Sequence, residues 1–161
     1  HAPVIIFDDA DLDQAVKGVV AGIFAASGQT CVAGSRLLVQ ETIHDAFLER
    51  LRAFVADVRF GHPADPQTQV APISTRPQME KIRAYVDIAR REGARLVAGG
   101  EPASVPGYPN GLFYRPTIFA DVRNDMRIAR EGGIAGIREY MEVKSVWIST
   151  ALDIPNPFIR R

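Results

Sequence analysis

The chain has 161 residues, a length that suits a single domain, and 47% of them are hydrophobic and 24% charged. Its 19 basic and 19 acidic residues leave no net charge, which argues against nucleic acid or an anionic membrane surface as partners, since both attract a basic excess. No apolar run reaches the roughly 20 residues that a membrane-spanning helix needs.

The first strand and helix are predicted near the N-terminus. Residues 3–7 form a short apolar run rich in β-branched side chains, which is typical of a buried strand of a parallel sheet. Asp11 is a candidate N-cap for a helix whose apolar side chains repeat at three- and four-residue steps over residues 12–24. Ser27 and Gly28 indicate where this helix stops.

A second strand and helix follow. Residues 35–40 predict the strand. Thr42, with Asp45 three positions later, has the spacing of a capping box and predicts the start of a helix that runs to Val58.

The next predicted element is a helix that follows a loop. Residues 61–70 contain two prolines and a glycine, which indicates the loop. The helix is expected to begin near residues 74–75, because Pro77 is tolerated in a first turn, and Gly93 is the expected residue just after its end.

Three more segments complete the pattern. Residues 94–98 predict a strand, residues 99–111 a long surface loop with three prolines, and residues 113–122 another extended segment. Strands thus alternate with helices at least twice, so the expected fold class is α/β, with a largely parallel sheet and flanking helices.

Cys31 is the only cysteine, which excludes an internal disulfide and fits a reducing, cytoplasmic location. The three histidines, His1, His44 and His62, have no ligand spacing, so we predict no metal site. The chain begins without Met and without the basic region of a signal peptide, and we expect His1 to be the cut end of a longer protein.

Two roles are open for Cys31 from the residues alone. A lone cysteine is most often a small buried hydrophobe. However, Cys31 lies between a helix end and a strand, in a loop with glycines on both sides, and such loops concentrate function. A nucleophilic cysteine also needs a base, a cation or backbone donors nearby, and no histidine lies close to it in sequence.

Residues 24–36, FAASGQTCVAGSR, resemble the cysteine active-site signature of the aldehyde dehydrogenase superfamily. Further stretches resemble other parts of that family in the same order. They are residues 3–13 (PVIIFDDADLD), 92–100 (EGARLVAGG), 115–122 (RPTIFADV), 126–129 (MRIA) and 139–148 (EYMEVKSVWI). The chain is therefore identified as a member of this superfamily.

The resemblance implies an incomplete aldehyde dehydrogenase catalytic domain over residues 1–150, with a C-terminal strand at 143–148 and an irregular tail at 151–161. It implies a small aldehyde as substrate, NAD or NADP as cofactor, and a homo-oligomer. The balanced charge and the histidine spacing, not the resemblance, predict no nucleic acid, membrane or metal as partner.

By the same resemblance, Cys31 is the catalytic thiolate, which attacks the aldehyde and leads through a thioester to the carboxylic acid. Its backbone N–H helps to hold the oxyanion. Gly28 and Gln29 shape the loop on the nicotinamide side. Arg36 is expected to fix the loop by pairing with carboxylates or carbonyls. A partly exposed thiol, more reactive than a free one at neutral pH, is the resulting expectation for Cys31.

Three departures from the family pattern affect the expected activity. The general base, a Glu in a Glu-Leu-Gly-Gly motif, and the dinucleotide-binding half are expected upstream of His1. The sequence also jumps near residues 129–132 to a segment that resembles the family's C-terminal region. Glu131 lies at this junction, and we assign it no cofactor role but that of a solvated loop carboxylate.

Three hypotheses follow. The chain is a piece of an NAD(P)-dependent aldehyde dehydrogenase, or a non-catalytic remnant that keeps assembly surfaces such as a strand edge. Alternatively, it is a cysteine-dependent esterase or acyl transferase that needs no nicotinamide.

Overall fold

The computed structural model describes residues 3–131. In chain order the elements are β1 (Pro3–Ile6), α1 (Leu12–Phe24), the 3-10 turn η1 (Ala25–Gly28), β2 (Arg36–Val39), the 3-10 turn η2 (Glu41–Ile43), α2 (His44–Ala56), α3 (Arg76–Arg91), β3 (Arg95–Ala98), β4 (Ile118–Ala120) and α4 (Arg127–Glu131). The predicted strand at 143–148 and the tail at 151–161 lie outside the described residues.

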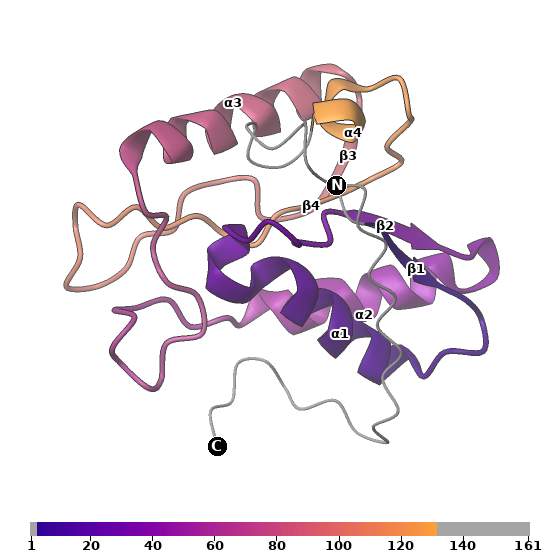
Figure 1. Cartoon of the computed structure of the whole chain (residues 1–161), viewed down its shortest axis with the longest axis horizontal. Coiled ribbons are helices and arrows are strands. Elements are labelled where there is room, and N and C mark those ends of the chain that lie inside the picture. Colours follow the sequence, from indigo (N-terminus) through magenta and orange to yellow (C-terminus); the bar gives the residue numbers. More distant parts are fainter. Residues whose placement is uncertain (1–2, 132–161) are drawn as a thin grey trace.

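The first group of elements is a β1–α1–β2 unit with α2 packed beside it (Figure 1). β1 and β2 pair in parallel, in register from Pro3 opposite Arg36 to Ile6 opposite Val39. A parallel pair needs a crossover, and α1 provides it. The predicted cap is confirmed, since the Asp11 carboxylate accepts hydrogen bonds from two backbone N–H groups of the first helical turn, both at 3.0 Å. The α/β class with a parallel pair is therefore confirmed.

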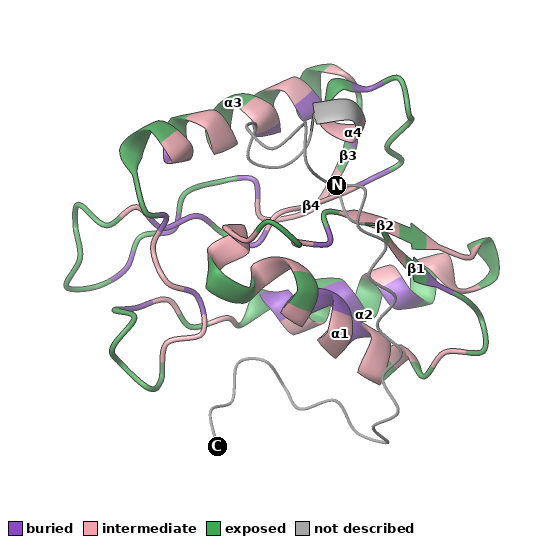
Figure 2. Cartoon of the chain, in the orientation of Figure 1, coloured by how far each residue is buried: buried purple, intermediate pink, exposed green. Residues whose placement is uncertain are grey.

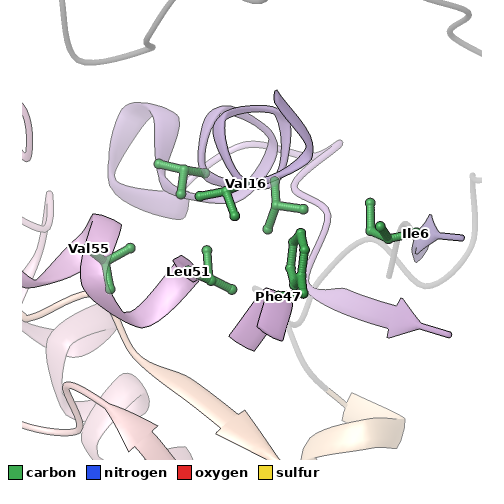
Figure 3. Close-up of a cluster of buried hydrophobic side chains, with 7 residues drawn as sticks. Ile6, Val16, Phe47, Leu51 and Val55 are labelled. Atoms are coloured by element: carbon green, nitrogen blue, oxygen red, sulfur yellow. The ribbon is translucent and has the colours of Figure 1, made fainter. Parts of the chain in front are cut away.

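The main core lies where α1, α2 and the inner face of β1 meet (Figure 3). Its members are apolar side chains at helical spacing on α1 and α2, together with one from β1: Ile6, Val16, Val19, Val20, Phe47, Leu51 and Val55. Phe47 and Val20 are fully buried. Figure 2 shows buried residues on both helices. This core holds the β1–α1–β2 crossover in place.

The second group is α3, β3, β4 and α4, which Figure 1 shows above the first group. α3 begins as predicted: Thr75 is its N-cap and accepts a hydrogen bond from the backbone N–H of Gln78. Gly93 follows its end with a φ of 87°, a left-handed conformation that favours glycine. β3 and β4 pair antiparallel, unlike the predicted parallel arrangement of most strands, because no helix crosses over between them.

The start of α2 differs from the sequence prediction. Thr42 is not a helix N-cap but the middle residue of η2, and α2 begins at His44 without a side-chain cap. Instead of closing a capping box, the Asp45 carboxylate lies 2.9 Å from Nδ1 of His44. The helix start predicted from the capping-box spacing was therefore wrong, because the chain makes a tight 3-10 turn before the helix.

The predicted surface loop at 99–111 is partly internal. Ala103 and Val105 are buried against Phe113, and the backbone N–H of Ala103 donates to the Phe113 carbonyl at 3.0 Å. The predicted extended segment at 113–122 contains a strand only from Ile118 to Ala120. Pro116 provides a reason, because proline has no N–H for a strand ladder.

Gly34 supplies a first prediction. A Cβ at Gly34 would lie 2.6 Å from Cγ2 of Val4, whose branched side chain turns with difficulty, whereas a Cβ at Gly22 in α1 meets nothing within 4 Å. We expect Gly34→Ala to lower the free energy of unfolding by roughly 1–3 kcal/mol, and Gly22→Ala to raise it by up to about 1 kcal/mol through helix propensity. Urea denaturation measures both, and a Gly34→Ala chain as stable as wild type would contradict the packing.

The Arg95–Asp121 ion pair supplies a second prediction. The Arg95 guanidinium donates to Asp121 at 2.6 Å and lowers the pKa of that carboxyl. A lowered folded-state pKa means that the pair stabilises the fold above the ordinary aspartate pKa, and that this contribution is lost as the pH falls through the lowered value. Asp121→Asn should therefore lower the Tm at pH 7 and lower it less at pH 2, while Asp9→Asn, at an exposed carboxylate, serves as control. An equal Tm loss at both pH values would contradict this.

Candidate active site

Cys31 lies in a tight turn between η1 and β2. The backbone N–H of Ala33 donates to the Thr30 carbonyl at 3.3 Å and closes the turn, with Cys31 and Val32 at its tip. The Cys31 side chain is exposed, and Val32 is 66% exposed. The described structure therefore favours the accessible thiol over the buried-hydrophobe alternative.

The chain enters this turn through a strained backbone. Ala26, Ser27 and Gly28 have successive φ values of 49°, 56° and 73°. Only glycine adopts this left-handed region readily, and non-glycine residues persist there when their surroundings hold them.

Side-chain hydrogen bonds hold this stretch in place. The Ser27 hydroxyl donates to the Ala71 carbonyl at 2.7 Å. The Gln29 side-chain oxygen accepts from the backbone N–H of Ser74 at 3.0 Å, and its amide nitrogen donates to the Ala26 carbonyl at 3.2 Å. Sequence reasoning selected Gln29 but missed Ser27 and the segment at Ala71–Ser74, because no local pattern signals partners more than 40 residues away.

The residues that follow the turn are also held by packing and hydrogen bonds. Gly34 is buried, and its N–H donates to the Gly22 carbonyl in α1 at 3.0 Å. At the start of β2, Arg36 donates to the side-chain oxygen of Asn124 at 2.9 Å. The expected pairing of Arg36 with a carbonyl oxygen is confirmed, and the oxygen belongs to a side-chain amide. That this bond fixes the loop stays a prediction.

A hollow of about 750 Å³ opens between the two groups of elements. Gly28 and Gln29 are among its lining residues, and Arg36 and Arg115 add cationic side chains. Apolar residues of α1, β2, α3 and β4 form much of the remaining wall. Tyr114 also lines it, and burial raises the pKa of its hydroxyl. The structure thus brings the predicted loop residues Gly28 and Gln29 to a cavity beside the Cys31 turn.

Within residues 3–131, no three His, Cys, Asp or Glu side chains cluster closely enough to hold a metal ion. Over the same residues, no helix is long and apolar enough to cross a membrane. Glu131 is the last residue of α4.

Residues 1–146 match the model of the aldehyde dehydrogenase family. The chain belongs to this family. Among curated relatives, it is 47% identical over 131 residues to a betaine aldehyde dehydrogenase of Rhizobium johnstonii and 44% identical over 130 residues to one of Mesorhizobium japonicum. Each match covers 81% of this chain but only 26% and 27% of the respective relative. The chain thus spans about a quarter of the length of these relatives.

Solved structures agree with this assignment. A putative aldehyde dehydrogenase from Burkholderia cenocepacia matches with a TM-score of 0.77 at 41% identity, over 80% of this chain and 26% of that one. A betaine aldehyde dehydrogenase variant from Staphylococcus aureus, in complex with NAD+ and with a BME-modified cysteine, matches with a TM-score of 0.78 at 38% identity, over 81% of this chain and 26% of that one. The family resemblance inferred from the sequence is therefore confirmed.

The Arg36–Asn124 hydrogen bond supplies a third prediction. Arg36→Ala should lower the free energy of unfolding by about 0.5–1.5 kcal/mol, because the bond joins β2 to the segment before α4. Arg91→Ala, at an exposed arginine in the last turn of α3, is the control. Urea denaturation that shows no difference between the two variants would contradict an anchoring role.

Proposed function

We propose that this chain carries the nucleophile of an NAD(P)-dependent aldehyde dehydrogenase, which oxidises a small aldehyde to a carboxylic acid. The observation that supports this most is the exposed Cys31 at the tip of a tight turn, within the stretch that matches the family. Curated relatives are betaine aldehyde dehydrogenases, so betaine aldehyde is the first substrate to test.

The proposed chemistry begins at the Cys31 sulfur. As a thiolate, it forms a bond to the aldehyde carbon, and the backbone N–H of Cys31 donates to the oxygen that becomes negative. Loss of hydride from that carbon leaves a thioester on Cys31. Water then releases the carboxylic acid and restores the thiol.

The nicotinamide cofactor would supply the hydride acceptor. The hollow beside the Cys31 turn has the volume of an ordinary ligand site, which supports it as the place for such a group. Gly28 and Gln29, which line the hollow and precede Cys31 in the chain, are the residues proposed to border the nicotinamide. An aldehyde dehydrogenase of S. aureus binds NAD+, which supports the same cofactor here.

Location and assembly are part of the proposal. A single thiol fits a reducing cytoplasm. For assembly, the outer face of the β1–β2 pair supports contact with another copy of the protein, because Ile5 and Leu38 lie opposite each other in register and are 54% and 47% exposed.

A cysteine-dependent esterase or acyl transferase is the second candidate. The exposed Cys31 turn supports it directly, since attack on an ester needs the thiolate and an oxyanion donor but no nicotinamide. A non-catalytic assembly role, supported by the exposed face at Ile5 and Leu38, is the third.

A fourth prediction separates these functions. In a chain of only these 161 residues the family's Glu-Leu-Gly-Gly base is missing, so hydrolysis of an acyl-enzyme should be slowed by about 10²–10⁴-fold. We therefore expect p-nitrophenyl acetate to give a burst of one p-nitrophenol per chain and then slow turnover, with the acetyl group on Cys31 by mass spectrometry.

The controls are Cys31→Ala, which should abolish the burst, and Val32→Ala, in the same turn, which should keep it. NADH formation from NAD+ and betaine aldehyde, also lost in Cys31→Ala, would establish the dehydrogenase. A burst without NADH would favour the esterase. If the chain gives neither the burst nor NADH but still self-associates, the assembly role is favoured.

A further inference from the structure

We propose that Gln29 is a positioning residue that fixes the Cys31 turn by tying it to Ser74, ahead of α3. The inference rests on the proposed function of Cys31 as nucleophile. It adds a specific task for the side chain of Gln29, which is separate from any contact that the loop makes with a cofactor.

The two partners of the Gln29 amide determine its orientation. The Ser74 N–H can only donate, so it selects the side-chain oxygen at 3.0 Å, and the Ala26 carbonyl can only accept, so it selects the nitrogen at 3.2 Å. One side chain thereby connects the beginning of the Cys31 loop, two residues before Cys31, with a segment 45 residues away.

The segment that receives this bond is itself held. Ile73 is buried, and its backbone N–H donates to the Leu112 carbonyl at 2.7 Å. On the other side of Ser74, Thr75 caps α3. The anchor therefore has a packed neighbour on one side and a helix start on the other.

A second bond reaches the same segment. The Ser27 hydroxyl donates to the Ala71 carbonyl at 2.7 Å. The two bonds thus hold one residue within the left-handed stretch at Ala26, Ser27 and Gly28 and the residue directly after it. Such a conformation persists under constraint of this kind. Loss of the Gln29 bonds should allow this stretch to relax and the turn behind it to shift.

A shift of the turn should slow acylation of Cys31 by an ester more than its alkylation. Attack on an ester needs the Cys31 N–H aimed at the developing oxyanion, and small misplacements of such groups are costly. Alkylation by iodoacetamide needs only an accessible thiol. The ratio of acylation to alkylation therefore reports the position of the turn, whereas a change in exposure or global stability would alter both rates.

The experiment compares the wild-type chain with Gln29→Ala, Gln29→Glu and the control Gln67→Ala, an exposed glutamine in the loop at 61–70. Rates of acylation by p-nitrophenyl acetate and of alkylation by iodoacetamide are measured at Cys31, the only thiol. Amide hydrogen exchange at Ser74 is followed in the same proteins.

We expect Gln29→Ala to slow acylation about 10-fold and to leave alkylation within about twofold of wild type. Ser74 exchange should be about 10-fold faster, because its acceptor is lost. Gln29→Glu keeps a carboxylate oxygen for the Ser74 N–H and should lie between Gln29→Ala and wild type in acylation, with Ser74 still protected. Gln67→Ala should match wild type in all three measurements.

Unchanged Ser74 exchange in Gln29→Ala would overturn the proposal, as would acylation and alkylation that fall by the same factor. If the wild-type chain acylates no faster than a free thiol while Ser74 exchange still responds to Gln29→Ala, then the proposed function fails and the Gln29–Ser74 tie stands.

Discussion

Parallel pairing of β1 and β2 requires the chain to cross back over the sheet between Ile6 and Arg36, and α1 makes this crossing. The remainder of the crossover reverses direction over residues 25–35, between the end of α1 and the start of β2. Cys31 lies within this short return. The position of the thiol is thus a consequence of the sheet topology and of the core that holds α1 against α2.

The return has little conformational freedom. It starts with a left-handed stretch, makes a closed turn at Thr30–Ala33, and passes Gly34, which has no room for a Cβ beside Val4. Strain of this kind is tolerated where surrounding contacts compensate for it. Here the compensation comes from Ser27 and Gln29, and both reach the segment at 71–74. The Cys31 turn, which follows α1, is consequently held by the segment that precedes α3.

The parts of this architecture that sequence reasoning predicted are those with local causes. α1 was predicted because its apolar side chains repeat at helical spacing and because Asp11 can cap it within one turn. α3 was predicted because Pro77 suits a first turn and Gly93 a helix end. The prediction of Thr42 as an N-cap was wrong. It rested on the local spacing to Asp45, and the sequence pattern does not show the competing 3-10 turn. The antiparallel β3–β4 pair, the burial of Ala103 and the Gln29–Ser74 bond depend on residues distant in sequence, for which one sequence offers no signal.

The outer face of the β1–β2 pair is exposed, whereas the inner face packs against the helices. Val4 and Ile6 point toward the helices, while Ile5 and Leu38 form an apolar pair on the outer side. A two-stranded sheet covered on one face is a marginal structure, so the core at Phe47 and Leu51 supplies the stability that the strands lack. That core needs no contact with the outer face. The Cys31 turn has its own hydrogen bonds to the segment at 71–74, so the nucleophilicity proposed for Cys31 can be measured separately from assembly and from cofactor binding.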